Sequence, residues 1–83
     1  MKIEKIIQKM LARPKEIAYK DVKKVLEHEG WILDRVKGSH HIYVKKDGTL
    51  YPLVLPVHGK MLKAHYIREI VELLELEEKY GEK

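Results

Sequence analysis

The chain has 83 residues, of which 45% are hydrophobic and 36% charged, and it has no cysteine. This length fits one small folded domain, and the lack of cysteine excludes disulfides, thiolate catalysis and cysteine-based zinc sites. The net charge of +4 is unevenly distributed, since residues 35–63 carry six basic side chains against one acidic side chain. A phosphate-binding surface requires such a basic region, although a solvated, lysine-rich surface would have the same composition.

No stretch approaches the roughly 20 apolar residues that a membrane span needs. The N-terminus is charged and amphipathic and lacks the apolar core of a signal peptide, so we expect a cytoplasmic protein with no membrane partner. No repeat or long linker divides the sequence. We therefore expect a single domain over residues 1–83, with a helical extension at 1–14, a core at 15–78 and a charged tail at 79–83.

The first 30 residues have the periodicity of two amphipathic helices. The apolar residues of the first predicted helix share one face: Ile3, Ile6, Ile7, Met10 and Leu11. Pro14 ends this helix, because proline disfavours helical geometry in the residue before it. A second helix has an apolar stripe from Ala18 to Leu26, and Gly30 stands where a left-handed C-terminal cap belongs.

From Trp31 the hydrophobic period changes from 3.6 to 2, which predicts strands at 31–37, 40–46 and 49–57. Gly38-Ser39 predicts the first turn, and Asp47-Gly48 predicts a hairpin. Pro52 and Pro56 cannot donate to a sheet ladder, which indicates a strand that lies at a sheet edge or is bent.

A final helix closes the predicted order, and its apolar stripe comprises Ile67, Ile70, Val71 and Leu74. The order helix, helix, strand, strand, strand, helix predicts an α+β fold. In this fold helices cover one face of a three-stranded antiparallel sheet, and the other face is left for water or a ligand.

The second strand carries two adjacent histidines whose side chains alternate between the faces. If Ile42 and Val44 face the helices, His40 points the same way and is expected to be a partly buried structural residue. His41, Tyr43 and Lys45 are then expected on the open face. There a cation could bind phosphate, a phenol ring could stack on a base and an imidazole could transfer protons. The alternative for His41 is an exposed strand residue with no function.

A metal site is not expected, because adjacent histidines on a strand point apart and the remaining histidines lack a tight ligand spacing. Ser39 is the only serine, so no serine triad can be assembled. Catalysis would therefore be acid–base chemistry on histidine, without a metal or another cofactor. His58 follows the third predicted strand and could reach a ligand.

An ordered set of motifs resembles the HicA (YcfA-like) toxin family. The set comprises Gly30-Trp31, Arg35, Gly38-Ser39-His40-His41, Pro56-Val57-His58-Gly59-Lys60 and a helix from about Ala64. The resemblance covers roughly residues 18–76, and Gly-Ser-x-His between two strands is its most specific part. The helix at 2–11 is an extension beyond the family's minimal domain, and Ala64 replaces a proline that often follows lysine at this point in the family.

This resemblance implies a fold like the double-stranded-RNA-binding domain, α-β-β-β-α, with an extra N-terminal helix here. It implies the toxin of a type II toxin–antitoxin system, a ribosome-independent endoribonuclease that cleaves mRNA. The implied partner is a HicB-type antitoxin protein that covers the active surface. The catalytic histidine of the family falls on His41, Gly38 and Ser39 form the turn that positions it, and His58 matches a less fixed position.

The predicted mechanism is metal-independent cleavage of RNA, with His41 as general base on the ribose 2′-OH or as general acid on the leaving oxygen. Lys37, Lys45 and Lys60 would hold phosphate. The second acid–base group is open between His40 and His58. Two alternatives remain: a non-catalytic RNA-binding module, and a protein-interaction domain whose basic face meets an acidic partner.

Overall fold

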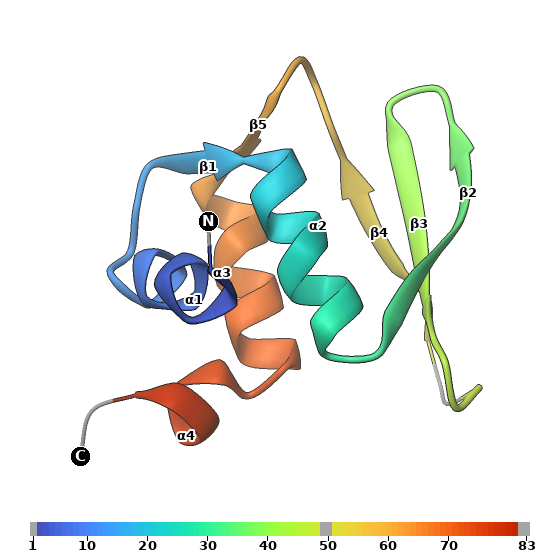
Figure 1. Cartoon of the computed structure of the whole chain (residues 1–83). Coiled ribbons are helices and arrows are strands. Elements are labelled where there is room, and N and C mark those ends of the chain that lie inside the picture. The colour runs from blue at the N-terminus through green and yellow to red at the C-terminus, as the bar shows by residue number, and fades with distance from the viewer. Residues whose placement is uncertain (1, 49–50, 82–83) are drawn as a thin grey trace.

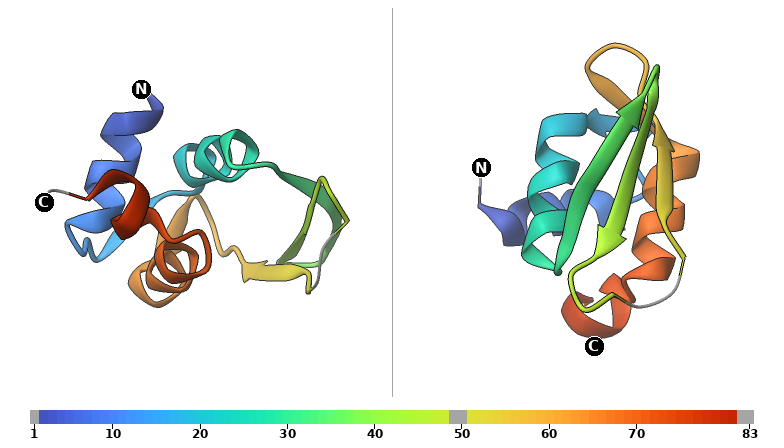
Figure 2. Two further views of the ribbon diagram at one scale, coloured as in Figure 1. Left: turned by 90° about the horizontal axis from the view of Figure 1, so that it is seen from below. Right: turned by 90° about the vertical axis from the view of Figure 1, so that its right-hand side faces the viewer.

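The computed structural model describes residues 2–48 and 51–81, and it has the predicted α+β architecture (Figure 1). The described elements are, in chain order, α1 (Ile3–Leu11), β1 (Glu16–Ala18), α2 (Tyr19–His28), β2 (Trp31–Lys37), β3 (His40–Lys45), β4 (Leu53–Pro56), β5 (Met61–Lys63), α3 (Ala64–Leu73) and α4 (Leu76–Tyr80). The sheet β2-β3-β4 is antiparallel, and the helices lie on one side of it (Figure 2). From α2 to α3 this arrangement matches the double-stranded-RNA-binding type of fold. None of the helices in the described ranges is long and apolar enough to cross a membrane.

The central strand β3 pairs with β2 on one side and β4 on the other, so β4 is an edge strand, as Pro56 predicted. Tyr43 lies between Leu33 and Leu53, and His41 lies between Val36 and Leu55. The register of β2 shifts by one residue between Leu33 and Arg35, which marks a bulge. The third strand is shorter than predicted, and residues 49 and 50 of that prediction lie outside the described residues.

Three short elements were not predicted from the sequence. β1 and β5 form a separate two-stranded antiparallel sheet, in which Ile17 pairs with Leu62. Three residues are too few to show an alternating pattern, so such strands carry no periodic signal. Lys79 and Tyr80, which the sequence assigned to a charged tail, lie in α4, whose first residue Leu76 is buried.

The prediction that Ile42 and Val44 face the helices is wrong. Tyr43 is fully buried within the main core, together with β-strand residues such as Trp31 and Leu55, and neither Ile42 nor Val44 belongs to this core cluster. Because neighbours on a strand alternate, His41 and Tyr43 therefore face the helices. Ile42 is only 8% exposed on the other face, where Arg35 and Val54 flank it across the sheet.

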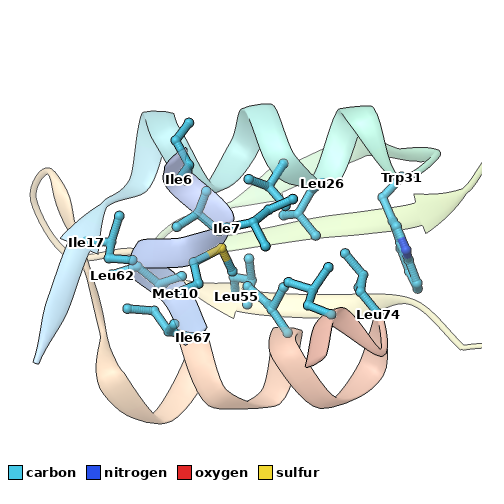
Figure 3. Close-up of a cluster of buried hydrophobic side chains, with 14 of the residues drawn as sticks. Ile6, Ile7, Met10, Ile17, Leu26, Trp31, Leu55, Leu62, Ile67 and Leu74 are labelled. Carbon is cyan, nitrogen blue, oxygen red and sulfur yellow. The ribbon is translucent and has the colours of Figure 1, made fainter. Parts of the chain in front are cut away.

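The N-terminal helix α1 contributes to the same core as the sheet (Figure 3). Ile6, Ile7 and Met10 are at most 2% exposed, and α1 packs against α2, α3 and α4. Burying an isoleucine side chain contributes roughly 1.5–3 kcal/mol. The predicted extension is therefore an integral part of the packed structure, although it precedes the motif-bearing segment.

The C-terminal helix α4 is tied to α2 by a polar cluster around Glu29. The Glu29 carboxylate accepts hydrogen bonds from Lys79 Nζ and from the Tyr80 hydroxyl, each at 2.9 Å. Gln8 Nε2 also donates to the Tyr80 carbonyl oxygen at 3.1 Å, which links α1 to α4. Burial raises the pKa of Glu29, but the hydrogen bonds from Lys79 and Tyr80 and the nearby charges of Lys79 and His28 together outweigh burial, so its pKa lies below the ordinary value.

Replacing Glu29 by glutamine is expected to lower the free energy of unfolding by about 1 kcal/mol at neutral pH, a modest value because Lys79 is half exposed. A carboxyl with a depressed pKa in the folded state stabilises the fold above its unfolded pKa, and this contribution is lost as the pH falls through the folded value. The difference in free energy of unfolding between wild type and Glu29→Gln is thus expected to shrink below about pH 4.3. Urea unfolding at neutral and acidic pH measures it, and a constant difference would contradict the assignment.

Candidate nucleic-acid site

His41 is held by an aromatic side chain from the start of α2. Its Nδ1 lies 2.9 Å from the Tyr19 hydroxyl, within hydrogen-bond distance. The two rings meet edge to face, with centroids 4.8 Å apart and an interplanar angle of 70°. The His41 side chain is half-buried, and among the described residues only Tyr19 is hydrogen-bonded to its ring. One ring nitrogen is therefore fixed by the protein, and Nε2 is left for a ligand.

A second tyrosine extends this contact into the core. The Tyr43 hydroxyl is hydrogen-bonded to that of Tyr19, and the Tyr43 side chain is fully buried. The prediction that Tyr43 stacks on an RNA base is therefore wrong, because no face of its ring is accessible. Burial, followed by the hydrogen bond to Tyr19, raises the pKa of Tyr43 far above its ordinary value, so this hydroxyl stays protonated.

The fold brings together the two sequence motifs that flank β3 and β4. The Val57 amide donates to the Ser39 carbonyl oxygen at 2.7 Å, and the Tyr19 amide donates to the Lys60 carbonyl oxygen at 2.8 Å. The β2–β3 turn, the loop 57–60 and the start of α2 thus lie at the same end of the molecule, the upper end in Figure 1. Gly38 has a φ of 57° in this turn, a left-handed conformation that glycine adopts at little cost.

Several predicted residues lie at this end of the sheet with exposed side chains. Lys37 pairs with His40 across the first hairpin, and both are exposed. His58 and Lys60 are also exposed, and His58 forms a bridge with Met61 that closes their loop. The structure therefore places two cations and two further imidazoles around the end of the sheet where His41 lies.

Two other predictions about individual residues are not met. Lys45 stands four residues from His41 along β3, or about 13 Å away, and its ammonium lies 5.9 Å from the centre of the Trp31 ring. It is held there as a cation–π partner and is not part of the His41 end. His40 is exposed where a partly buried structural residue was predicted, because β3 presents the opposite face to the helices.

Sequence reasoning missed Tyr19 altogether. It stands 22 residues from His41 in the sequence and belongs to no motif. Its place as the first residue of α2 follows from the short strand β1, which itself left no periodic signal. Only the packing of α2 against the sheet brings the two side chains together.

A hollow of about 460 Å³ lies elsewhere, between α1, α3 and α4, and includes none of the predicted site residues. Its floor comes from apolar residues such as Met10 and Ile67, and several glutamates stand at its rim. Over residues 2–48 and 51–81, no three histidine, aspartate or glutamate side chains are placed to hold a metal ion.

A comparison with protein families gives one clear result. The model of the family described as HicA toxin of bacterial toxin–antitoxin systems matches residues 19–76. The matched range begins at Tyr19, contains the whole sheet β2-β3-β4 and ends at the first residue of α4. Neither a curated protein nor a solved structure matches the chain significantly.

Proposed function

The chain belongs to the HicA family, the toxins of bacterial toxin–antitoxin systems, and from this premise we propose that it is an endoribonuclease that cleaves mRNA through His41. The observation that carries the proposal is the half-buried His41 ring, fixed through Nδ1 by Tyr19 at the end of the sheet where Lys37 and Lys60 are exposed. An imidazole held at one nitrogen and free at the other is suited to proton transfer.

In the proposed reaction the RNA backbone lies across the β2–β3 turn and the loop 57–60. His41 takes the proton of a ribose 2′-OH, and the 2′-oxygen attacks the adjacent phosphorus. The bond from phosphorus to the 5′-oxygen breaks, and that oxygen receives a proton. The products are a 2′,3′-cyclic phosphate and a 5′-hydroxyl.

The lysines at this end supply the positive charge that such a reaction needs. Lys60 contacts the phosphate and offsets the negative charge that develops on its oxygens. Lys37 shares the face of its cross-strand partner His40, so it contacts the RNA backbone from the other side of the β2–β3 turn. Ser39 and the Gly38 turn hold the start of β3 in register beside Val57, since the Ser39 carbonyl is hydrogen-bonded there. Their role is to position His41 relative to the lysines.

The second acid–base group is His58 in this proposal. His40 projects from the opposite face of β3 to His41, because adjacent strand residues alternate. His58 stands in the loop whose Lys60 carbonyl is bonded to the Tyr19 amide, and its side chain is exposed. That loop adjoins the residue that holds His41, so His58 is the better placed of the two for the leaving oxygen.

Membership of the family implies an antitoxin partner. We propose a protein antitoxin of the HicB type that covers the His41 end and blocks access of RNA. The cytoplasm, where mRNA is translated, is the proposed place of action. The basic side chains between residues 35 and 63 would favour acidic groups on this partner.

Incubation of the purified chain with end-labelled RNA in excess EDTA tests the proposal. Discrete cleavage products are expected, together with weaker cleavage as salt rises, because phosphate contacts are screened. Retarded migration of intact RNA would instead identify a non-catalytic binding module. Absence of both cleavage and binding at low salt would indicate a domain that contacts protein alone.

A further inference from the structure

The Tyr19 hydroxyl is hydrogen-bonded to the His41 ring, and the Tyr43 hydroxyl is hydrogen-bonded to that of Tyr19. The reaction described above uses neither hydroxyl. We propose that Tyr19 is a positioning residue whose oxygen accepts the Nδ1 proton of His41, so that the ring presents an unprotonated Nε2 to RNA. This inference rests on the proposed role of His41. It assigns to Tyr19 and Tyr43 the task of selecting which imidazole nitrogen reacts.

The direction of the hydrogen bond between the two tyrosines follows from the burial of Tyr43. A fully buried hydroxyl must place its proton on an acceptor, because an unpaired buried donor is costly. Among the described residues the only hydrogen-bond partner of the Tyr43 hydroxyl is Tyr19. Tyr43 therefore donates, and the Tyr19 oxygen accepts.

The Tyr19 oxygen has a second acceptor site, since a hydroxyl can accept two hydrogen bonds. His41 Nδ1 is 2.9 Å from this oxygen and can fill that site by donating its proton. The Tyr19 side chain is half-buried, so its own proton can be given to water. All three groups are then satisfied, with one proton on each donor.

This arrangement is the one that histidine catalysis through Nε2 requires. As a base, the neutral ring must carry its proton on Nδ1 and leave Nε2 free; as an acid, it carries both protons, and Nδ1 again donates. If Tyr19 donated to Nδ1 instead, the unprotonated nitrogen would be directed at the protein and Nε2 could not accept a proton from RNA.

The position of Tyr19 is itself well determined. It is the first residue of α2, it follows Ala18, which pairs with Met61, and its amide is bonded to the Lys60 carbonyl. The edge-to-face packing of the two rings further restricts the plane of the imidazole. Burial raises the pKa of Tyr19 as well, so both tyrosines remain neutral at physiological pH.

The direct test is nitrogen-15 NMR of the histidine side chains at about pH 9, where imidazole rings are neutral. The His41 signal is identified by its loss in His41→Ala. In the wild-type chain the proton is expected on Nδ1, and a proton found mainly on Nε2 would overturn the proposal. This measurement needs neither RNA nor a Tyr19 variant, so it separates failure of the positioning role from failure of the proposed ribonuclease activity.

Tyr19→Phe then tests the consequence for catalysis, since it keeps the ring and removes only the oxygen. The Nδ1 preference is expected to be lost. kcat for RNA cleavage is expected to fall roughly 10- to 100-fold with little change in KM, the range found for groups that orient metal-binding histidines. Tyr80→Phe is the matched control, because it removes a hydroxyl hydrogen-bonded to Glu29 in another part of the fold. Unchanged tautomer and kcat in Tyr19→Phe would contradict the assignment.

Discussion

Replacement of His41 by alanine is expected to reduce RNA cleavage by roughly 10²- to 10⁴-fold, the usual contribution of a general acid or base. Growth arrest on expression of the chain should disappear with it. The fold should persist, because the side chain is only half-buried and its one hydrogen bond among the described residues is to Tyr19. A gel-based cleavage assay and a circular dichroism spectrum on the same preparation measure both properties.

The matched control for this variant is His65→Ala. His65 lies on α3, its side chain is 72% exposed and its Nε2 is 3.2 Å from Glu69, so its removal affects no group near His41. His65→Ala should cleave RNA at the wild-type rate. Equal activity of the His41 and His65 variants would remove His41 from the mechanism.

Replacement of Ile7 by alanine is expected to lower the free energy of unfolding by about 2–5 kcal/mol, the range for large-to-small changes in a packed core. This is a large part of the 5–15 kcal/mol that holds a domain folded. The loss is expected because Ile7 is fully buried in the core cluster to which α2, α3 and the sheet also contribute. Urea unfolding measures the change.

Ile3→Ala provides the comparison on the same helix, since Ile3 is only partly buried against the cluster. Ile3→Ala should lower the free energy of unfolding clearly less than Ile7→Ala does. If both variants lowered the free energy of unfolding by the same small amount, α1 would not be part of the stable fold. A large cost at Ile7 would establish that the family-matched range 19–76 depends on a helix outside it.

The main elements of this fold can be predicted from the sequence because they are long enough to repeat their pattern. The stripe that includes Ile6 and Ile7 predicted α1, the change of period at Trp31 predicted the sheet, and Pro56 predicted its edge strand. β1 and β5 have three residues each, and α4 has five. Elements of this length span fewer than two periods, so tertiary contacts decide them.

The orientation of β3 could not be derived from that strand alone. It carries Ile42 and Val44 on one face and Tyr43 on the other, so both faces are partly apolar. The partner strands decide: β2 and β4 place Leu33 and Leu53 beside Tyr43 in the core. Hydrophobicity predicted that the branched aliphatic residues Ile42 and Val44 face the core. The core instead contains Tyr43, whose hydroxyl is hydrogen-bonded to that of Tyr19.

The same error affected the reasoning about His41. Alternation along β3 predicted its ring on the face away from the helices, beside an exposed Tyr43 and Lys45, whereas Tyr43 is buried in the core and Lys45 lies over the Trp31 ring. The Gly-Ser-x-His motif and the family match, by contrast, do not depend on the face. The role proposed for His41 therefore rests on these and on its contact with Tyr19, a residue that no local pattern could have indicated.

The most direct test of the proposed chemistry is cleavage of an RNA that carries a single 2′-deoxy nucleotide at the cleaved position. If His41 activates the 2′-OH, the wild-type chain should leave this bond intact, and should cut the all-ribose RNA to give a 2′,3′-cyclic phosphate and a 5′-hydroxyl. Cleavage of the deoxy-substituted bond at an undiminished rate would contradict attack by the 2′-oxygen and with it the role of His41 as its base.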